Sequence, residues 1–168
     1  MVNYYGIATR KDLELFTGEV CAFFDDELII NDELNQKYID SYNMLMETMC
    51  VETLLGNMPD TDNKQGMGLP QIDRIKYDDI ILNSQEHQAK IWNKWHIDIN
   101  LVTFESLRYS WKESIIFERL GYKRIIEAIP STREERSVYW KKWWNTYEGS
   151  GKPSEYMERS NRFLGEEK

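Results

Sequence analysis

Apolar residues recur every three or four positions over most of the chain, and this spacing most constrains the fold. The spacing matches the 3.6 residues per turn of an α-helix, so amphipathic helices are expected. The period vanishes between Gly56 and Asp79, where Gly, Pro, Asn and Asp cluster. The sequence therefore predicts a mainly α domain of the α+β kind, with one long irregular loop or small hairpin inserted between helices.

Five helices are expected from the apolar spacing. Asn31 or Asp32 can cap the second helix, and a capping box after Pro130 can open the fifth. The expected extents are about Lys11 to Phe24, from Asn31 or Asp32 to near Glu52, a short helix after Ser84 that carries Trp92 and Trp95, about Trp111 to Ala128 with Ile126 on its apolar face, and a helix opened by Ser131-Thr132-Arg133-Glu134.

The composition narrows the classes of function. The chain has 168 residues, of which 41% are hydrophobic, and this suits one domain with one core. The net charge of -8 argues against binding to nucleic-acid phosphates, which requires a positive surface. No stretch of about 18 apolar residues exists, so no membrane span is expected. The first residues lack the pattern of a secretory signal. We therefore expect synthesis in the cytoplasm.

The spacing of the cysteines and histidines in the sequence does not indicate a disulfide or metal site. Cys21 and Cys50 lie in apolar surroundings and are expected to be reduced core residues. His87 and His96 have no Cys or His at ligand spacing. Neither a disulfide framework nor a zinc site is therefore predicted.

Glu52 departs from the apolar face on which it lies. It continues the register of Leu45 and Met49, near the last turn of its helix, and it faces the irregular segment. A carboxylate placed there is partly removed from water, which raises its pKa toward the range that a general acid needs at neutral pH. The alternative interpretation is a glutamate at a helix end that reaches solvent.

Two blocks of sequence follow Glu52 in an informative order. Thr53 comes directly after it, and Gly66-Met67-Gly68-Leu69-Pro70-Gln71-Ile72 comes a short loop later. This order resembles the soluble lytic transglycosylases and goose-type lysozymes. In these families a catalytic Glu, usually followed by Ser, ends a helix, and a Gly-x-Gly-Leu-Met-Gln-Ile segment follows. Here Thr53 replaces the Ser and Pro70 replaces the Met.

A third block near the C-terminus supports the resemblance. The segment Trp143-Trp144-Asn145-Thr146-Tyr147-Glu148-Gly149-Ser150-Gly151 is similar to the Ala-Tyr-Asn-Ala-Gly helix that closes the family's cleft over the Glu. Asn145 and the glycines match, but Trp144 stands where the family has Tyr, and Gly149 comes two residues later than in the family pattern. Tyr139 or Tyr147 is therefore expected to supply the aromatic hydroxyl. The stretch from Glu52 to Tyr156 resembles a variant seen in bacteriophage cell-wall-degrading proteins.

The resemblance implies a single lysozyme-like domain over residues 1–168. Residues 1–30 carry no resemblance and form an expected N-terminal helical extension, and residues 31–164 form the expected catalytic core. A central helix would end in Glu52, and the irregular segment would form one wall of the cleft.

The resemblance also implies a reaction. Glu52 would act as general acid and base in cleaving peptidoglycan between N-acetylmuramic acid and N-acetylglucosamine, as a lytic transglycosylase or a lysozyme. No metal or organic cofactor is implied. The residues expected to bind substrate are Thr53, Gly68, Leu69, Gln71, Tyr139, Trp144 and Asn145.

The residue types suit a sugar ligand, although each has a simpler interpretation. Glycines allow backbone to approach a sugar closely, and amides both donate and accept hydrogen bonds to hydroxyls. Trp140, Trp143 and Trp144 can stack on sugar faces, but a Trp stripe on a helix is more often core. Asp60 and Asp62 can serve as a second carboxylate, but Asp also favours turns.

Two other functions remain open from the sequence. One is a catalytically inactive lysozyme-like module that serves as a structural or adaptor part of a phage particle, next to other particle proteins. The other is an acidic inhibitor of a host protein. The main interpretation places the protein in the periplasm or cell wall, or within a phage particle, with peptidoglycan as its partner.

Overall fold

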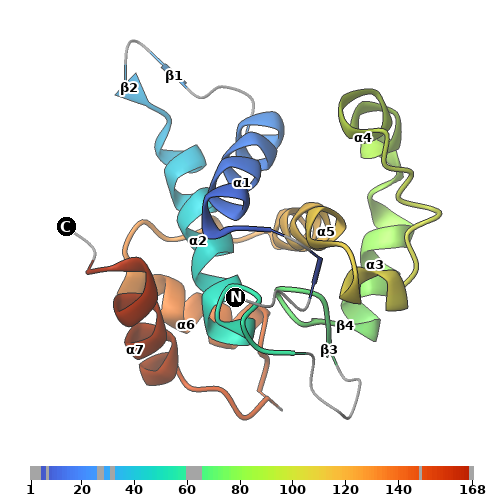
Figure 1. Cartoon of the computed structure of the whole chain (residues 1–168). Helices are drawn as coiled ribbons and strands as arrows, with labels where there is room; N and C mark the ends of the chain where they lie inside the picture. The colour runs from blue at the N-terminus through green and yellow to red at the C-terminus, as the bar shows by residue number, and fades with distance from the viewer. Residues whose placement is uncertain are drawn as a thin grey trace.

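The computed structural model confirms a mainly helical protein (Figure 1). The structure describes residues 5–6, 8–25, 29–30, 33–59, 66–147 and 149–166. The α-helices within these ranges are α1 (Arg10–Phe24), α2 (Gln36–Thr53), α3 (Arg74–Asn83), α4 (Gln88–Trp95), α5 (Trp111–Lys123), α6 (Arg133–Trp143) and α7 (Pro153–Leu164). None of the helices in the described part of the chain has the length and apolar character needed to cross a membrane.

The strands are short and form two separate antiparallel pairs. Strand β1 (Ile29–Ile30) pairs with β2 (Glu33–Leu34), and β3 (Gly66–Met67) pairs with β4 (Ile72–Asp73). The β3–β4 pair is the small hairpin that the sequence allowed in the irregular segment. Its register joins Gly66 to Asp73 and Met67 to Ile72.

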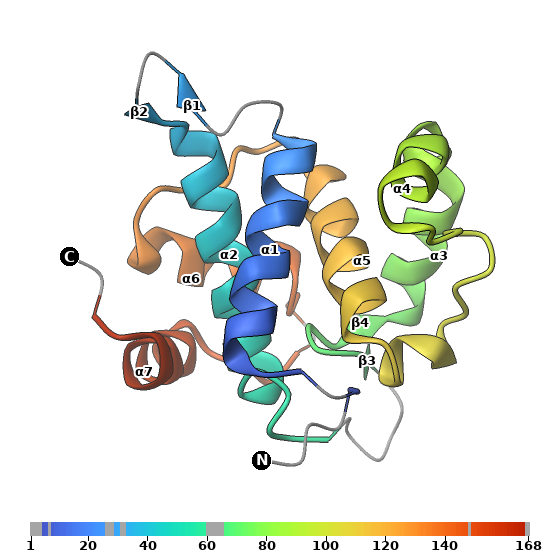
Figure 2. The ribbon, with the colours of Figure 1, turned by 45° about the horizontal axis from the view of Figure 1, so that its top comes forward.

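The helices pack around a central group made of α1, α2 and α5 (Figures 1 and 2). Helices α3 and α4 lie on one side of this group, and α6 and α7 lie on the other. Cys21 and Cys50 are free and buried in the core, as expected. The β3–β4 hairpin lies near the C-terminal end of α2, where Glu52 is located.

Helix α2 is a core helix because its second half is buried on every side. Its N-terminus is capped by the side chain of Asn35, which accepts a hydrogen bond from the Lys37 N–H at 3.0 Å. Every residue from Met44 to Val51 is buried. The helix ends at Leu54, which adopts the left-handed conformation with φ of 51°. The sequence placed the start of this helix too early, at Asn31 or Asp32, both of which lie outside the described residues.

Two other helix boundaries and one whole helix differ from the sequence prediction. Residues from Arg74 onward form α3, whereas irregular chain was expected as far as Asp79. The apolar residues of α3 show only a weak helical period, because Ile80 is the one fully buried side chain of this helix. Helix α5 ends at Lys123, and Ile126 is fully exposed instead of lying on an apolar face. Helix α7 was not expected, since it buries little besides Tyr156 and Ser160.

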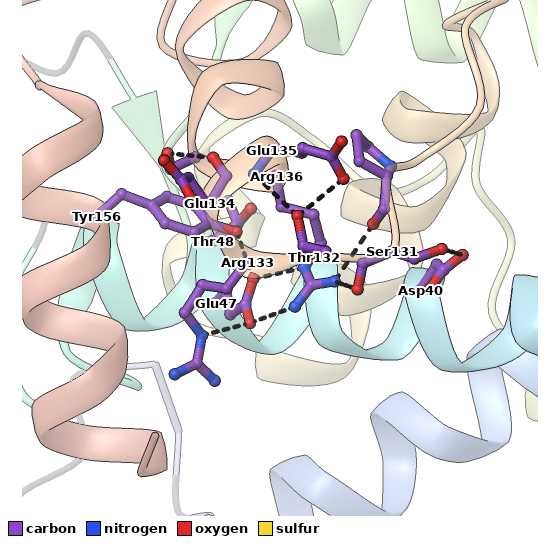
Figure 3. A network of polar contacts seen from close by, with 12 residues as sticks. Asp40, Glu47, Thr48, Ser131, Thr132, Arg133, Glu134, Glu135, Arg136 and Tyr156 are labelled. Atoms are coloured by element: carbon purple, nitrogen blue, oxygen red, sulfur yellow. Dashed lines mark hydrogen bonds and ion pairs between the residues drawn. The ribbon is translucent and has the colours of Figure 1, made fainter. Parts of the chain in front are cut away.

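A buried charged network fixes helices α6 and α7 against α2 (Figure 3). The Glu47 carboxylate of α2 accepts hydrogen bonds from Arg133 Nε at 2.8 Å, from Arg136 Nε at 2.7 Å and from Tyr156 Oη at 2.7 Å. Arg136 also donates to the carbonyl of Ser131 at 2.6 Å. Because Glu47 lies five residues before Glu52, this network sets where α6 meets the end of α2.

Candidate functional site

Glu52 lies on the last turn of α2 and is half-buried. Its Oε1 accepts a hydrogen bond from the indole Nε1 of Trp140 on α6 at 3.1 Å. Burial raises the pKa of the Glu52 carboxyl to about 7, against the opposing effects of the Trp140 hydrogen bond and of the positive charges of Lys76 and Arg159. The group therefore exists in both protonation states near neutral pH, as a general acid and base requires.

The Thr53 hydroxyl joins the end of α2 to the second block of sequence. It donates to the carbonyl of Leu69 at 2.8 Å and accepts from the N–H of Gly56 at 3.2 Å. Thr53 is fully buried, so its hydroxyl forms hydrogen bonds within the protein and does not face a ligand.

Gly68 and Leu69 are also buried. Gly68 has φ of +74°, and a Cβ there would meet Ser114 Oγ of α5 at 2.3 Å. The glycine is thus required by contact with protein rather than by the close approach of a sugar that the sequence suggested. Leu69 is fully buried, and it contributes its backbone carbonyl to the contact with Thr53.

Gln71 lies at the tip of the hairpin turn and is half-buried. Its backbone has φ of 51°, and its side-chain amide donates to the carbonyl of Gly68 at 2.9 Å. The same amide lies 3.5 Å from the Tyr5 hydroxyl. These contacts give Gln71 a role in shaping the turn.

The third block packs against the second through Trp144. The Trp144 indole N–H donates to the carbonyl of Pro70 at 2.8 Å, and the ring stacks on Tyr122 at 4.5 Å between centroids. Trp144 is 3% exposed, which places its ring in the core and away from a sugar face. Asn145 is half-buried, and its Oδ1 accepts from Lys141 Nζ at 2.8 Å.

Three segments that are distant in sequence therefore meet at the end of α2. Glu52 contacts α6 through Trp140, Thr53 contacts the hairpin through Leu69, and Trp144 contacts the hairpin through Pro70. This convergence of the blocks was expected from the sequence.

The aromatic group that faces Glu52 differs from the expectation. The Tyr139 hydroxyl donates to the carbonyl of Glu127 at 2.9 Å, and Tyr147 is fully exposed. Trp140, which is 1% exposed, supplies the donor instead. No signal in the sequence distinguished Trp140 from the other tryptophans of this helix, because a Trp stripe on a helix is more often core.

Backbone strain gathers around the same place. Among the described residues, the non-glycine residues with positive φ are Leu54, Leu55, Gln71, His96 and Thr146. All except His96 belong to the segments that meet around Glu52. Left-handed backbone at a residue with a Cβ costs of order 1 kcal/mol or more and tends to cluster at functional sites. The strain is an independent indication of a site here.

A large open groove lies beside this region. It has a volume of about 1160 Å³ and runs between α3, the segment after α5, and the end of α6. Its lining includes Lys76, Glu127 and Trp143, and it also includes Gly149. Glu52 is not part of the lining, but Lys76 is, and the Lys76 charge also acts on the Glu52 carboxyl. Lys76 thus links the lining of the groove to the surroundings of Glu52.

Two further groups near Glu52 were not singled out from the sequence. Lys76 Nζ lies 4.5 Å from the centre of the Trp144 ring and donates to the Trp144 carbonyl at 3.2 Å. Glu118 on α5 is completely buried. A single glutamate in an amphipathic pattern gave no reason to single it out. Asp60 and Asp62, the candidate second carboxylates, lie outside the described residues.

No group of three or more His, Cys, Asp or Glu among the described residues could hold a metal ion. Comparison of the chain with models of protein families, with curated proteins and with solved structures finds no significant match.

Proposed function

We propose that the protein is a lysozyme-like enzyme that cleaves the glycan strand of peptidoglycan, with Glu52 as general acid and base. The observation that carries this proposal is a half-buried carboxyl whose pKa is raised to about 7, at the point where three sequence blocks meet. The same blocks carry the resemblance to lytic transglycosylases and goose-type lysozymes. The groove beside Lys76 supports it, because its volume suits a ligand of several sugar rings.

The chemistry follows from the state of Glu52. The protonated carboxyl gives its proton to the glycosidic oxygen as the bond to the sugar carbon breaks, and it becomes a carboxylate. The N-acetyl group of the substrate assists at the sugar carbon. The Glu52 carboxylate then takes a proton from the muramyl 6-hydroxyl, which closes a 1,6-anhydro ring. In a hydrolase, water would attack the sugar carbon in place of that hydroxyl and would give its proton to the carboxylate.

The test of the proposal is lysis by Glu52→Gln. We expect this variant to fold as the wild type and to lose at least about 100-fold in the rate at which it clears a peptidoglycan suspension, since a general acid contributes on that scale. Glu113→Gln is the matched control. Glu113 is another half-buried glutamate whose pKa is raised by burial, but it contacts Ser106 instead of the site. Equal lysis by folded Glu52→Gln and wild type would contradict the assignment.

Mass spectrometry of the released muropeptides distinguishes the two reactions. We expect 1,6-anhydromuramyl ends, because the resemblance implies a reaction that a single glutamate carries out. Reducing ends, together with a large loss of rate in Asp60→Asn or Asp62→Asn, would identify a hydrolase instead. A wild-type protein that binds peptidoglycan but releases no fragments would favour the inactive structural module.

A further inference from the structure

Helices α2 and α5 run antiparallel, with one hydrogen bond joining their facing sides. Thr48 Oγ1 of α2 and the Tyr122 hydroxyl of α5 lie 2.7 Å apart. Towards the start of α2, Lys37 and Arg119 both pair with Asp25. Towards its end, the hairpin that contacts Thr53 packs on Ser114. In the direction in which residue numbers increase along α2, they decrease along α5, so the two helices are antiparallel.

This arrangement brings a second carboxyl opposite Glu52. Glu52 follows Thr48 by four residues, and Glu118 precedes Tyr122 by four. Each lies one helical turn from the Thr48–Tyr122 bond, in the same direction, because the helices are antiparallel. The negative charge of Glu52 acts on the Glu118 carboxyl, in agreement with this placement.

The burial of the Glu118 carboxyl is energetically unfavourable. It is completely buried, and neither of its carboxyl oxygens has a hydrogen-bond partner among the described residues. A buried carboxylate without a partner is strongly disfavoured, so the group is protonated at neutral pH. It therefore carries an O–H donor for which the described residues supply no hydrogen-bond partner in this structure.

The other groups around Glu52 are already engaged. Trp140 of α6 donates to its Oε1. Lys76 of α3 bonds to Asp73 and to the carbonyl of Trp144, and Arg159 of α7 bonds to the carbonyl of Val51. On α5, the Tyr122 hydroxyl is occupied by Thr48.

We propose that Glu118 is a positioning residue whose carboxylic O–H donates a hydrogen bond to the Glu52 carboxylate once Glu52 has given up its proton. The proton stays on Glu118 throughout, and Glu118 never touches the substrate. The bond favours the ionised form of Glu52, so it makes Glu52 a stronger acid and holds the carboxylate in place until it takes a proton back. As a role in catalysis, this rests on the proposed function of Glu52.

The test compares two replacements of Glu118 by direct titration of Glu52. The Glu52 resonance is followed by NMR in protein labelled with ¹³C at the glutamate side-chain carboxyls, and Glu52→Gln assigns it. Glu118→Gln keeps an N–H donor, so the Glu52 midpoint should stay within a few tenths of a pH unit of wild type. Glu118→Met has similar length but no donor, so the midpoint should rise by about one unit, which is a tenfold change in the equilibrium.

Glu118→Leu is a second apolar variant, and both are expected to fold because they remove an unpaired buried acid. An unchanged Glu52 midpoint in the folded apolar variants would overturn the proposal, as would an equal rise in Glu118→Gln. The alkaline limb of the lytic pH profile should move with the midpoint. The titration needs no activity. A shifted midpoint in a protein without lysis would therefore refute the proposed function and leave the hydrogen bond standing.

Discussion

The state of Glu52 depends on a balance among few groups. Burial raises the pKa of its carboxyl, while the Trp140 hydrogen bond and the charges of Lys76 and Arg159 lower it, leaving a value of about 7. In the proposed reaction the protonated form is the acid that starts the reaction, so activity should be full below about pH 6 and fall as the pH rises through 7. Rates of lysis measured from pH 5 to 9 check this. A rate that rises steadily up to pH 9 would contradict the assignment of Glu52 as the acid.

The same pKa predicts a cost in stability. The carboxyl titrates higher in the folded protein than its ordinary value of 4.5, so the folded state loses stability as the pH rises from about 4.5 to about 7. Glu52→Gln removes this loss. We expect the variant to be more stable than wild type at pH 8, by on the order of 2 kcal/mol after allowing for partial exposure.

Urea unfolding of wild type and Glu52→Gln at pH 4.5 and pH 8 measures this difference. The two proteins should be close at pH 4.5 and should separate at pH 8. The same separation at both values would mean that the substitution acts through packing rather than through ionisation.

At this scale the sequence predicted the site unevenly. The register of Leu45 and Met49 was enough to predict that Glu52 is removed from water. The direction of the Trp140 indole was not, because a tryptophan on a helix packs in the core far more often than it faces a carboxyl. Glu118 was beyond prediction, since its importance comes from a helix more than sixty residues away in sequence.

Among the secondary-structure elements, the position of α6 depends on the Glu47 network. Glu47→Gln weakens the bonds to Arg133 and Arg136 and leaves two buried guanidinium groups without a full counter-charge. Breaking a buried pair in this way costs about 3–5 kcal/mol. The midpoint of thermal unfolding should therefore fall strongly, and lysis should fall with the folded fraction.

The matched control is Glu14→Gln. Its ion pair with Arg10 lies on the surface of α1, where side chains of 53% and 36% exposure interact. Removing such a pair costs about 0.5 kcal/mol or less. Comparable losses in the two variants would show that the Glu47 network does not hold α6 and α7.

The hairpin and α5 are joined by the contact at Gly68. Gly68→Ala places a Cβ 2.3 Å from Ser114 Oγ and also imposes positive φ on a residue with a Cβ. We expect a loss of about 2–4 kcal/mol in the free energy of unfolding. Ser114→Ala in the same chain removes the clashing oxygen and should recover part of the loss. No recovery would mean that backbone strain alone is responsible.

The boundaries of the elements were predictable where one face is clearly apolar. The helix from about Lys11 to Phe24 was predicted to within one residue of α1. Helices α3 and α7 escaped because each buries few side chains, so no period of apolar residues marks them. The end of α5 was predicted too late because Ile126 continues the apolar spacing of this helix beyond the turn that ends it.

For the whole molecule, the groove relates the site to its surroundings. Helices α3 and α6 lie on opposite sides of the central helices (Figure 1). The groove is lined by the start of α3 and by Trp143 at the end of α6. A glycan is a long polymer, so a site for it requires an open surface on both sides of the cleaved bond. The groove offers this surface on the side of Lys76.

Trp143 is the aromatic side chain in the lining of the groove, and under the proposed function it would contact a sugar. It is half-buried, in contrast to the buried Trp140 and Trp144, and its indole N–H donates to Glu127 at 3.1 Å. That bond holds the ring in place, so little conformational freedom is lost on binding. We expect Trp143→Ala to weaken the binding of an N-acetylglucosamine trimer about tenfold, since an aromatic face contributes roughly 1–1.5 kcal/mol.

Trp92→Ala is the control for this prediction, because Trp92 is 49% exposed on α4 and lies outside the groove lining. NMR titration with the trimer follows both indole N–H signals in the wild type, and each variant assigns its own signal by its loss. The Trp143 signal should move with the trimer concentration, while the Trp92 signal stays still. If only Trp92 responds, or if Trp143→Ala binds the trimer as tightly as wild type, the glycan does not follow this groove and must reach Glu52 from the side of the hairpin.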